Sequence, residues 1–440
     1  MSELKNTEEK KKLVFVGSEI HFEVGGGYFF LFNLARTIAQ TDSYEVFCVN
    51  VPNERLEKIY LNDNIHFISV HKCDFTQFEG ADFVVPLNYM FYFLNRARNI
   101  KQGRILLYNW HPDANLWLNN QILYWYNNYN NLMSYLGSKK SLYFMDESCF
   151  LSMNMWCDYK FDKNIIPVFP STPQQSYQIL EIINPNRISL GWLGRLDPDK
   201  INSVINLLDQ LALSKLDIPI DVHIIGDGKS KNKINAKKYT SKINVIFTSY
   251  LYGDARDKYI RSNIDIMVAV GMAALDATNL SIPTVIPIMS PNRFTNNQFV
   301  FLFDTYGYSL SWNPEALSEL NVKTHTIDEV MQKVCTPGGK SSLGFQCYNY
   351  MDENFNVEKS SRRVLDALEQ SQLSVPDCLA HKVIRKQLKS FDLYKKLRKR
   401  EYTEFRGFAN RINRMKGKSI IEKTRIIAKI IAGSIKNRNK

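Results

Sequence analysis

Short apolar runs of five or six residues recur along the chain, and between them apolar residues return at helical spacing. Within the first 170 residues the apolar runs are 13–18, 45–50, 82–86, 104–109, 141–145 and 165–169. Runs of this length predict buried strands, whereas the spacing of Phe30, Leu34 and Ile38 predicts a helix with one apolar face. Strands that alternate with helices predict a parallel sheet covered by helices on both faces.

The pattern stops in a stretch with four prolines, at 167–185, and then begins again. Further strands are predicted at 188–193, 221–225, 245–248, 264–269 and 283–288, with helices at 198–213, 255–261 and 273–280. We therefore predict an α/β protein with two doubly wound Rossmann-like domains facing a cleft, at 1–180 and 186–350. In open sheets of this kind, ligands bind at the carboxyl ends of the strands.

The last part of the chain is helical and then basic. Helices are predicted over about 313–370 with a break at Gly338-Gly339, and residues 351–375 are expected to pack back on the body. Residues 381–440 hold 20 Lys and Arg but only 4 Asp and Glu, a net charge of +16 that leaves −4 for the first 380 residues. A nearly neutral body with one basic end argues against a nucleic-acid-binding protein.

Residues 376–440 are predicted to form a basic amphipathic helical tail, and two interpretations of it remain open. It binds an anionic membrane surface through residues 381–440, or it packs on the body or on a partner with its basic face in solvent. The polar N-terminus does not resemble a signal peptide, and no apolar run is long enough to span a bilayer. Seven cysteines without a Cys-x-x-Cys pair fit a reducing compartment and no zinc site. We expect a cytoplasmic protein, peripheral on the inner face of the cell membrane.

A candidate anion site lies at the junction of strand 188–193 and helix 198–213. Arg195 and Lys200 flank the helix start, where free N–H groups and the helix dipole also favour an anion, and a diphosphate suits both cations. The alternative is a capped helix start with a solvated Arg and Lys, because Asp197 and Pro198 are good start residues. Asp197-Pro198-Asp199 has the spelling of a metal-binding Asp-x-Asp, but it lies between the two cations, so no metal ion is expected.

Two more junctions carry glycine. Gly226, after strand 221–225, either lets the backbone approach a ligand or simply turns the chain. The Gly271–Ala274 loop offers backbone N–H groups, and Asp276 on the following helix can accept from ribose hydroxyls. The alternative for this second junction is close packing of the helix on the sheet, with Asp276 a favourable charge near a helix start.

In this order, the three junctions resemble the C-terminal half of retaining GT-B glycosyltransferases of family 4, over about residues 187–290. That family has a strand ending in Gly-Arg with a Lys five residues later, a strand ending in Gly-x-Gly, and a helix with an acidic residue. It then has a Pro-x-Val strand, here Pro283-Thr284-Val285. The resemblance implies a GT-B fold and a nucleotide-diphosphate sugar as donor, with neither a cofactor nor a metal ion.

The resemblance also implies roles for individual residues. Arg195 and Lys200 would hold the donor diphosphate and stabilise the leaving nucleotide, and His111 would contact the sugar. For His111 the alternative is a surface or packing histidine beside Trp110. Asp276 would bind the ribose. The residues implied to bind the donor are Gly25, Gly26, Gly27, Gly194, Gly226, Tyr250, Leu251, Gly271, Met272, Ala273, Ala274 and Asp276.

The sequence departs from the family in its Glu-x7-Glu motif. Val268 stands where the first Glu usually touches the transferred sugar, and Asp276 replaces the second Glu. Asp146-Glu147 could line the same cleft or lie solvated in a loop. The leading hypothesis is transfer of a sugar, with retention, to a glycan or lipid-linked glycan acceptor in surface polysaccharide synthesis. The alternative is a catalytically degenerate GT-B protein that scaffolds assembly by binding nucleotide or glycan.

Overall fold

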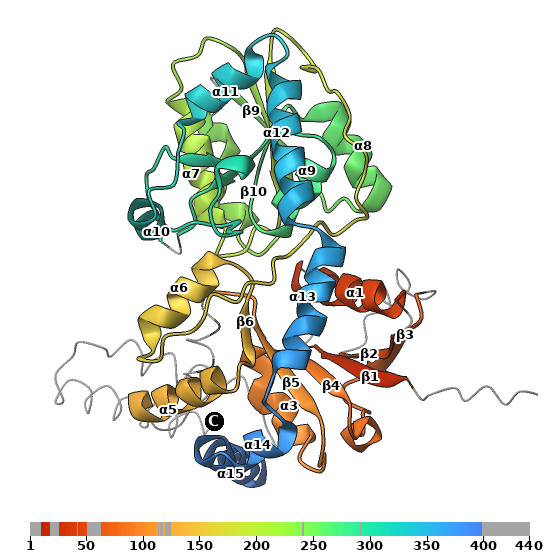
Figure 1. The fold of residues 1–440 in the computed structure, drawn as a ribbon. Helices are drawn as coiled ribbons and strands as arrows, with labels where there is room; N and C mark the ends of the chain where they lie inside the picture. The colour runs from red at the N-terminus through yellow and green to blue at the C-terminus, as the bar shows by residue number, and fades with distance from the viewer. Residues whose placement is uncertain are drawn as a thin grey trace, which may run out of the picture.

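The computed structural model describes residues 10–17, 26–41, 43–50, 63–112, 114, 118, 125–239, 242–290 and 292–397. These residues form two sheets of six strands each, one in each half of the chain, with helices packed around both (Figure 1). The predicted α/β architecture with two doubly wound units is therefore confirmed. Gly25 lies outside the described residues, as does the part of the predicted tail beyond residue 397.

The N-terminal sheet is parallel throughout, with strand order β3-β2-β1-β4-β5-β6. Its strands are β1 (Lys11–Val16), β2 (Tyr44–Asn50), β3 (Ile65–Ser69), β4 (Asp82–Pro86), β5 (Arg104–Asn109) and β6 (Leu142–Phe144). The principal helices that pack with this sheet are α1 (Gly26–Ala39), α3 (Met90–Arg96), α5 (Trp125–Ser138) and α6 (Glu147–Trp156). Strand β3 was not predicted, because its sequence, Ile65-His66-Phe67-Ile68-Ser69, has neither a long apolar run nor a regular alternation, and none of its residues is fully buried.

The predicted strand at 165–169 is wrong. Ile165 makes a single bridge to Phe144, and Ile166 N–H donates to the Phe144 carbonyl at 2.9 Å, but no ladder follows. Pro167 has no N–H and so cannot continue the pairing.

The C-terminal sheet has the order β12-β11-β10-β7-β8-β9, in which only β12 runs antiparallel among the described strands. Its strands are β7 (Ile188–Leu193), β8 (Ile220–Ile225), β9 (Ile243–Thr248), β10 (Ile266–Ala269), β11 (Thr284–Pro287) and β12 (Phe299–Phe301). Its helices are α7 (Ile201–Ala212), α8 (Gly253–Asn263), α9 (Met272–Asn279), α10 (Pro314–Glu319), α11 (Ile327–Cys335) and α12 (Gly339–Asn354). The predicted break before α12 falls at Gly338, whose φ of 69° is left-handed.

After α12 the chain returns to the N-terminal unit. Helix α13 (Val357–Gln370) packs against α1, and α14 (Val375–Ala380) and α15 (Lys382–Leu397) follow on the same unit (Figure 1). Val383, Ile384 and Leu388 are buried in the N-terminal core. The described start of the predicted tail therefore packs on the body, which is the alternative that the sequence left open. No helix among the described residues has the length and apolarity to cross a bilayer.

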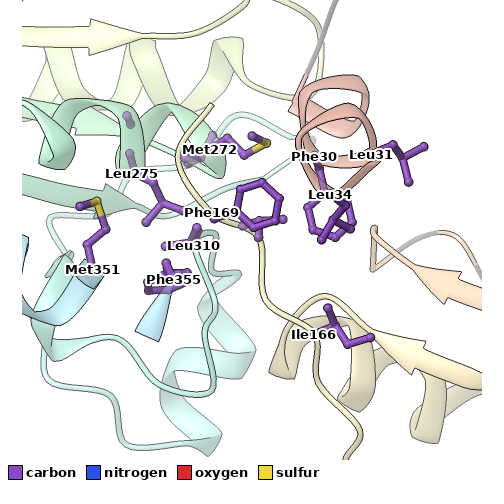
Figure 2. Close-up of a cluster of buried hydrophobic side chains, with 14 of the residues drawn as sticks. Phe30, Leu31, Leu34, Ile166, Phe169, Met272, Leu275, Leu310, Met351 and Phe355 are labelled. Carbon is purple, nitrogen blue, oxygen red and sulfur yellow. The ribbon is translucent and has the colours of Figure 1, made fainter. Parts of the chain in front are cut away.

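One apolar cluster joins the two units. Phe169 lies between Phe30 of α1, at a ring-centroid distance of 5.2 Å, and Met272 and Leu275 of α9 (Figure 2). The segment that follows Phe169 runs along α9 and is fixed there by hydrogen bonds. For example, Gln175 N–H donates to the Asn279 amide oxygen at 2.9 Å. The two carboxyl edges are thereby held close to each other.

Candidate functional site

The loop after β7 carries Arg195 and is bound along its length to the loop after β8. Gly194 N–H donates to the Ile225 carbonyl at 3.1 Å, and Leu196 N–H donates to the Asp227 carbonyl at 2.9 Å. Gly194 has a φ of 147°, a conformation that side-chain-bearing residues rarely adopt. Arg195 is therefore presented at the carboxyl edge of the sheet by a backbone with little freedom.

Gly226 and Gly228 make this contact possible. A Cβ at Gly226 would lie 2.2 Å from the carbonyl oxygen of Gly194, and a Cβ at Gly228 would lie 2.6 Å from that of Leu196. Both glycines thus allow two stretches of backbone to touch. Gly226, predicted to bind the donor, contributes to the site by supporting the Arg195 loop.

Lys200 is the residue before α7, and its side chain is half-buried. Its ammonium has no hydrogen bond or ion pair to the part of the chain that the structure describes. Burial, and then the nearby positive charge of Arg195, hold the pKa of Lys200 below its usual value. Arg195 itself pairs with Asp197 at 3.0 Å, which occupies only part of its five-donor guanidinium. An anion between the two cations would relieve their repulsion.

The start of α9 lies beside this loop, because β10 pairs with β7 and their last residues, Ala269 and Leu193, are in register. Gly271 caps the helix with φ 61° and ψ −144°, and no described atom lies within 4 Å of where its Cβ would be. Ala274 N–H donates to the Gly271 carbonyl at 3.0 Å. The N–H groups of Met272 and Ala273 have no acceptor among the described residues, as expected at a helix start that can bind an anion.

The start of α1 meets the start of α9 across the two units. A Cβ at Gly26 would lie 3.1 Å from the sulfur of Met272, and one at Gly27 would lie 3.3 Å from the Trp110 ring. Two helix N-termini therefore face the same region, and their dipoles add to its positive potential. The loop after β5 brings His111 there too, next to Trp110, and His111 N–H donates to the Asn109 side-chain oxygen at 3.3 Å.

Asp276 is not open to solvent. The residue is 6% exposed, and its carboxylate accepts from the N–H and the hydroxyl of Ser171, both at 2.6 Å, and from Arg256 at 2.9 Å. In this structure Asp276 fixes the connecting segment to α9. Ribose hydroxyls would have to replace these donors, so its role in ribose binding stays a prediction, for a state in which Ser171 has moved.

Val268 lies inside the sheet, with no exposed surface. It pairs with Trp192 on one side and Val285 on the other and belongs to the apolar core of the C-terminal unit. A carboxylate here would be buried without a partner, which is costly. At the position where the resemblance implied a sugar-contacting Glu, the structure therefore has a core residue.

The residues predicted to contact the base lie at the end of β9. Tyr250 is 37% exposed, its ring stacks on Tyr252 at 5.9 Å, and its hydroxyl donates to the Asp227 carbonyl at 2.6 Å. Leu251 is half-buried against the cluster that joins the units. Tyr250 thus stands beside the loop that supports Arg195.

Asp146 and Glu147, weighed as cleft acids, are engaged in structure. Asp146 caps α6 by accepting from Cys149 N–H at 2.8 Å, and burial raises its pKa to about 6. Glu147 pairs with Lys163. Within the described residues no group of three or more His, Cys, Asp or Glu has the arrangement of a metal site.

The structure thus gathers most predicted residues at adjoining strand ends and helix starts. Ser171 and Arg256, the partners of Asp276, were missed. No pattern in the sequence indicates these contacts, because Ser171 lies 105 residues and Arg256 lies 20 residues from Asp276 in the chain.

No protein-family model and no curated protein matches the sequence. Among solved structures, the apo form of the lipopolysaccharide outer core galactosyltransferase WaaB aligns with a TM-score of 0.52 at 14% identity, covering 81% of this chain and 99% of that chain. Sucrose-phosphate synthase from Thermosynechococcus elongatus aligns with a TM-score of 0.53 at 11% identity, covering 82% and 99%. These likenesses confirm the predicted GT-B fold, and at such identities they concern the fold alone.

Proposed function

We propose that this chain is a glycosyltransferase that moves a sugar from a nucleotide-diphosphate sugar to a glycan or lipid-linked glycan acceptor, with retention of configuration. The observation that carries the proposal is Lys200, a half-buried ammonium without a described partner whose charge is opposed by that of Arg195. Such a pair is stabilised by a shared anion, and a diphosphate matches a forked donor beside a point charge.

The chemistry follows from where charge develops. When the bond between the sugar and the diphosphate breaks, negative charge grows on the leaving phosphate oxygen. Arg195, Lys200 and the free N–H groups of Met272 and Ala273 would receive this charge. In this scheme the two cations neutralise the diphosphate without a metal ion or another cofactor. His111, on the side of the N-terminal unit, would contact the sugar next to the acceptor.

A thermal-shift panel of UDP-, GDP-, ADP- and CMP-sugars, with and without EDTA, tests the proposal. A preferred nucleotide at a hundredfold excess over its Kd stabilises the folded protein by about 2.7 kcal/mol. CMP-sugars carry a single phosphate and serve as the matched negative. Stabilisation by none of the diphosphate sugars would refute donor binding.

A non-catalytic scaffold that binds a nucleotide or glycan remains the second candidate. It is favoured by Val268, which leaves no carboxylate at the sugar-reading position, and by the Ser171 contacts that occupy Asp276. Nucleotide binding without turnover of any sugar or release of nucleoside diphosphate would support it over the enzyme.

Nucleotide affinity should fall as the pH rises on the alkaline side. Only the ammonium form of Lys200 attracts a diphosphate, and the pKa of Lys200 in the free protein lies below its usual value. The ammonium is therefore lost at a lower pH than that of an ordinary lysine. In Lys200→Arg the positive charge persists at alkaline pH. The alkaline rise of log Kd with pH should therefore be absent from this variant. A fall that persists in this variant would assign the titration to another group.

We also propose that the basic C-terminal region holds the protein on the inner face of the cell membrane, as a peripheral cytoplasmic protein. Helix α15 supports this, because its buried face turns its cations outwards. Lys382, Arg385, Lys386 and Lys389 are all exposed. No acidic residue lies between them.

Replacing Arg385, Lys386 and Lys389 by Gln should weaken sedimentation with anionic liposomes by about 100-fold, at roughly 1 kcal/mol per basic residue. Truncation after 375 is unsuitable because it removes core residues such as Ile384. The matched control removes three exposed lysines of the C-terminal unit, Lys229, Lys233 and Lys237, and should sediment like wild type. Equal loss in both variants would mean that net charge alone, and not α15, decides binding.

A further inference from the structure

The loop at residues 305–312, between β12 and α10, is held by both units at once. From the N-terminal unit, Glu147 N–H donates to the Gly307 carbonyl at 2.8 Å and Ser148 N–H donates to the Ser309 hydroxyl at 3.3 Å. The two serine hydroxyls also lie 3.2 Å apart. Glu147 and Ser148 belong to the first turn of α6, so the start of that helix rests directly on the loop.

The other end of the loop supports the donor site. Gly271 N–H donates to the Leu310 carbonyl at 2.9 Å. Gly271 is the residue before α9, whose free N–H groups belong to the proposed diphosphate site. Only Tyr308 and Ser309 thus lie between Gly307, whose carbonyl accepts from α6, and Leu310, whose carbonyl accepts from Gly271.

The loop has little freedom to absorb a movement of α6. Gly307 and Tyr308 have left-handed φ values of 58° and 62°, and a Cβ at Gly307 would lie 2.4 Å from that of Glu147. Ser309 and Leu310 are buried. A displacement at one end of such a segment is passed to the other end, because neither backbone nor side chains have room to relax.

We propose that the 305–312 loop couples the contact between the two units to the shape of the donor-phosphate site, with Ser148 and Ser309 as positioning residues. While α6 contacts the loop, the Leu310 carbonyl accepts from Gly271 N–H and fixes the position of the start of α9. When the units separate, Gly271 loses its fixed acceptor. The consequence for donor binding rests on the proposed function, whereas the coupling itself does not.

Hydrogen exchange of the Gly271 amide in the full, ligand-free chain tests the coupling. Ser148→Ala should speed exchange at Gly271 by about fivefold, the equivalent of one net hydrogen bond, although Ser148 does not touch Gly271. Ser148→Thr, which keeps the hydroxyl, should restore the wild-type rate. Ser138→Ala is the matched control, since its hydroxyl bonds only within α5. Unchanged exchange at Gly271 in Ser148→Ala would overturn the coupling.

Titration with UDP, GDP and ADP separates the two proposals. Ser148→Ala should weaken the preferred nucleoside diphosphate by about fivefold and raise the KM for its sugar more than it lowers kcat. If the exchange rate changes but wild type binds none of the three, the coupling stands and the proposed function fails. If a nucleotide binds equally to both proteins while exchange is also unchanged, the donor site stands and the coupling fails.

Oxidation of Ser148→Cys/Ser309→Cys provides a second test that does not depend on a weakened contact. A disulfide between these positions should slow exchange at Gly271 by at least fivefold and lower turnover, both reversibly on reduction. The single Ser148→Cys variant under the same oxidant is the control. A disulfide that forms without slowing Gly271 exchange would also overturn the coupling.

Discussion

Replacing Arg195 and Lys200 together by alanine should lower kcat/KM by at least 10²–10³-fold, the usual cost of removing one preorganised donor to a developing oxyanion. The thermal midpoint should stay within about 2 °C of that of the wild type. Lys200 has no partner among the described residues, and the ion pair of Arg195 with Asp197 is partly exposed to solvent. Removing Lys200 even relieves repulsion between the two cations. Two measurements check this prediction: turnover of the nucleotide sugar that stabilises the protein most in the thermal-shift panel, and the thermal midpoint of the double variant.

The single variants refine this result. Because both cations act on one anion, their effects should not add, and the double variant should lose less than the product of the single losses. Arg195→Lys should recover only part of the activity, since an ammonium cannot make a forked contact. Lys231→Ala is the control on the neighbouring loop, where Lys231 pairs with Asp227 at 3.4 Å. Wild-type turnover in the double variant would show that this loop does not bind the donor.

The second large effect concerns stability. Lys340 and Asp265 form an ion pair at 2.8 Å with 1% and 0% of their side chains exposed, and Asp265 also accepts from Ile183 N–H and Ser189 N–H. Lys340→Met leaves that carboxylate buried without its counter-charge. The free energy of unfolding of the C-terminal unit should fall by about 3–5 kcal/mol and its midpoint by roughly 10 °C.

An exposed ion pair provides the matched control. Lys238 is 54% exposed and pairs with Asp209 at 2.7 Å, and Asp209 keeps Arg293 and Tyr239 as partners when Lys238 is replaced. In urea titrations of both variants, Lys238→Met should therefore lower the unfolding midpoint far less than Lys340→Met does. Asp265→Asn in the Lys340→Met background should recover part of the loss by removing the uncompensated charge. Equal losses of stability in Lys340→Met and Lys238→Met would show that burial does not decide how much an ion pair contributes to stability.

From the sequence, those parts of the candidate site that are built from neighbouring residues could be predicted. The Gly194–Lys200 junction could be predicted because strand, glycine, cations and helix start follow one another within seven residues. The same holds for Gly271 before α9. In both cases the strand order then brings the junctions together, since parallel strands end at a common edge.

Contacts between distant residues could not be predicted in this way. Nothing around Asp276 indicates that Ser171 will occupy it, because that contact depends on the path of the connecting segment. The structural role of Gly226 was likewise hidden, because it depends on a close approach to the Gly194 backbone, which belongs to a different loop. Strand β12 was missed although its residues begin an apolar run over 299–303. Only Phe299–Phe301 pair as a strand, against β11, and Phe299 also bridges His325, and neither partner is a neighbour in sequence.

The return of α13, α14 and α15 to the N-terminal unit has a consequence for synthesis on the ribosome. A nascent chain that has emerged as far as residue 354 contains every strand of the second unit together with helices α7–α12. The first unit then still lacks Leu373, Val375 and Ile384, which belong to its core. Although it is translated first, it is therefore the last to be completed, and the second unit is the one whose core is contiguous in the chain.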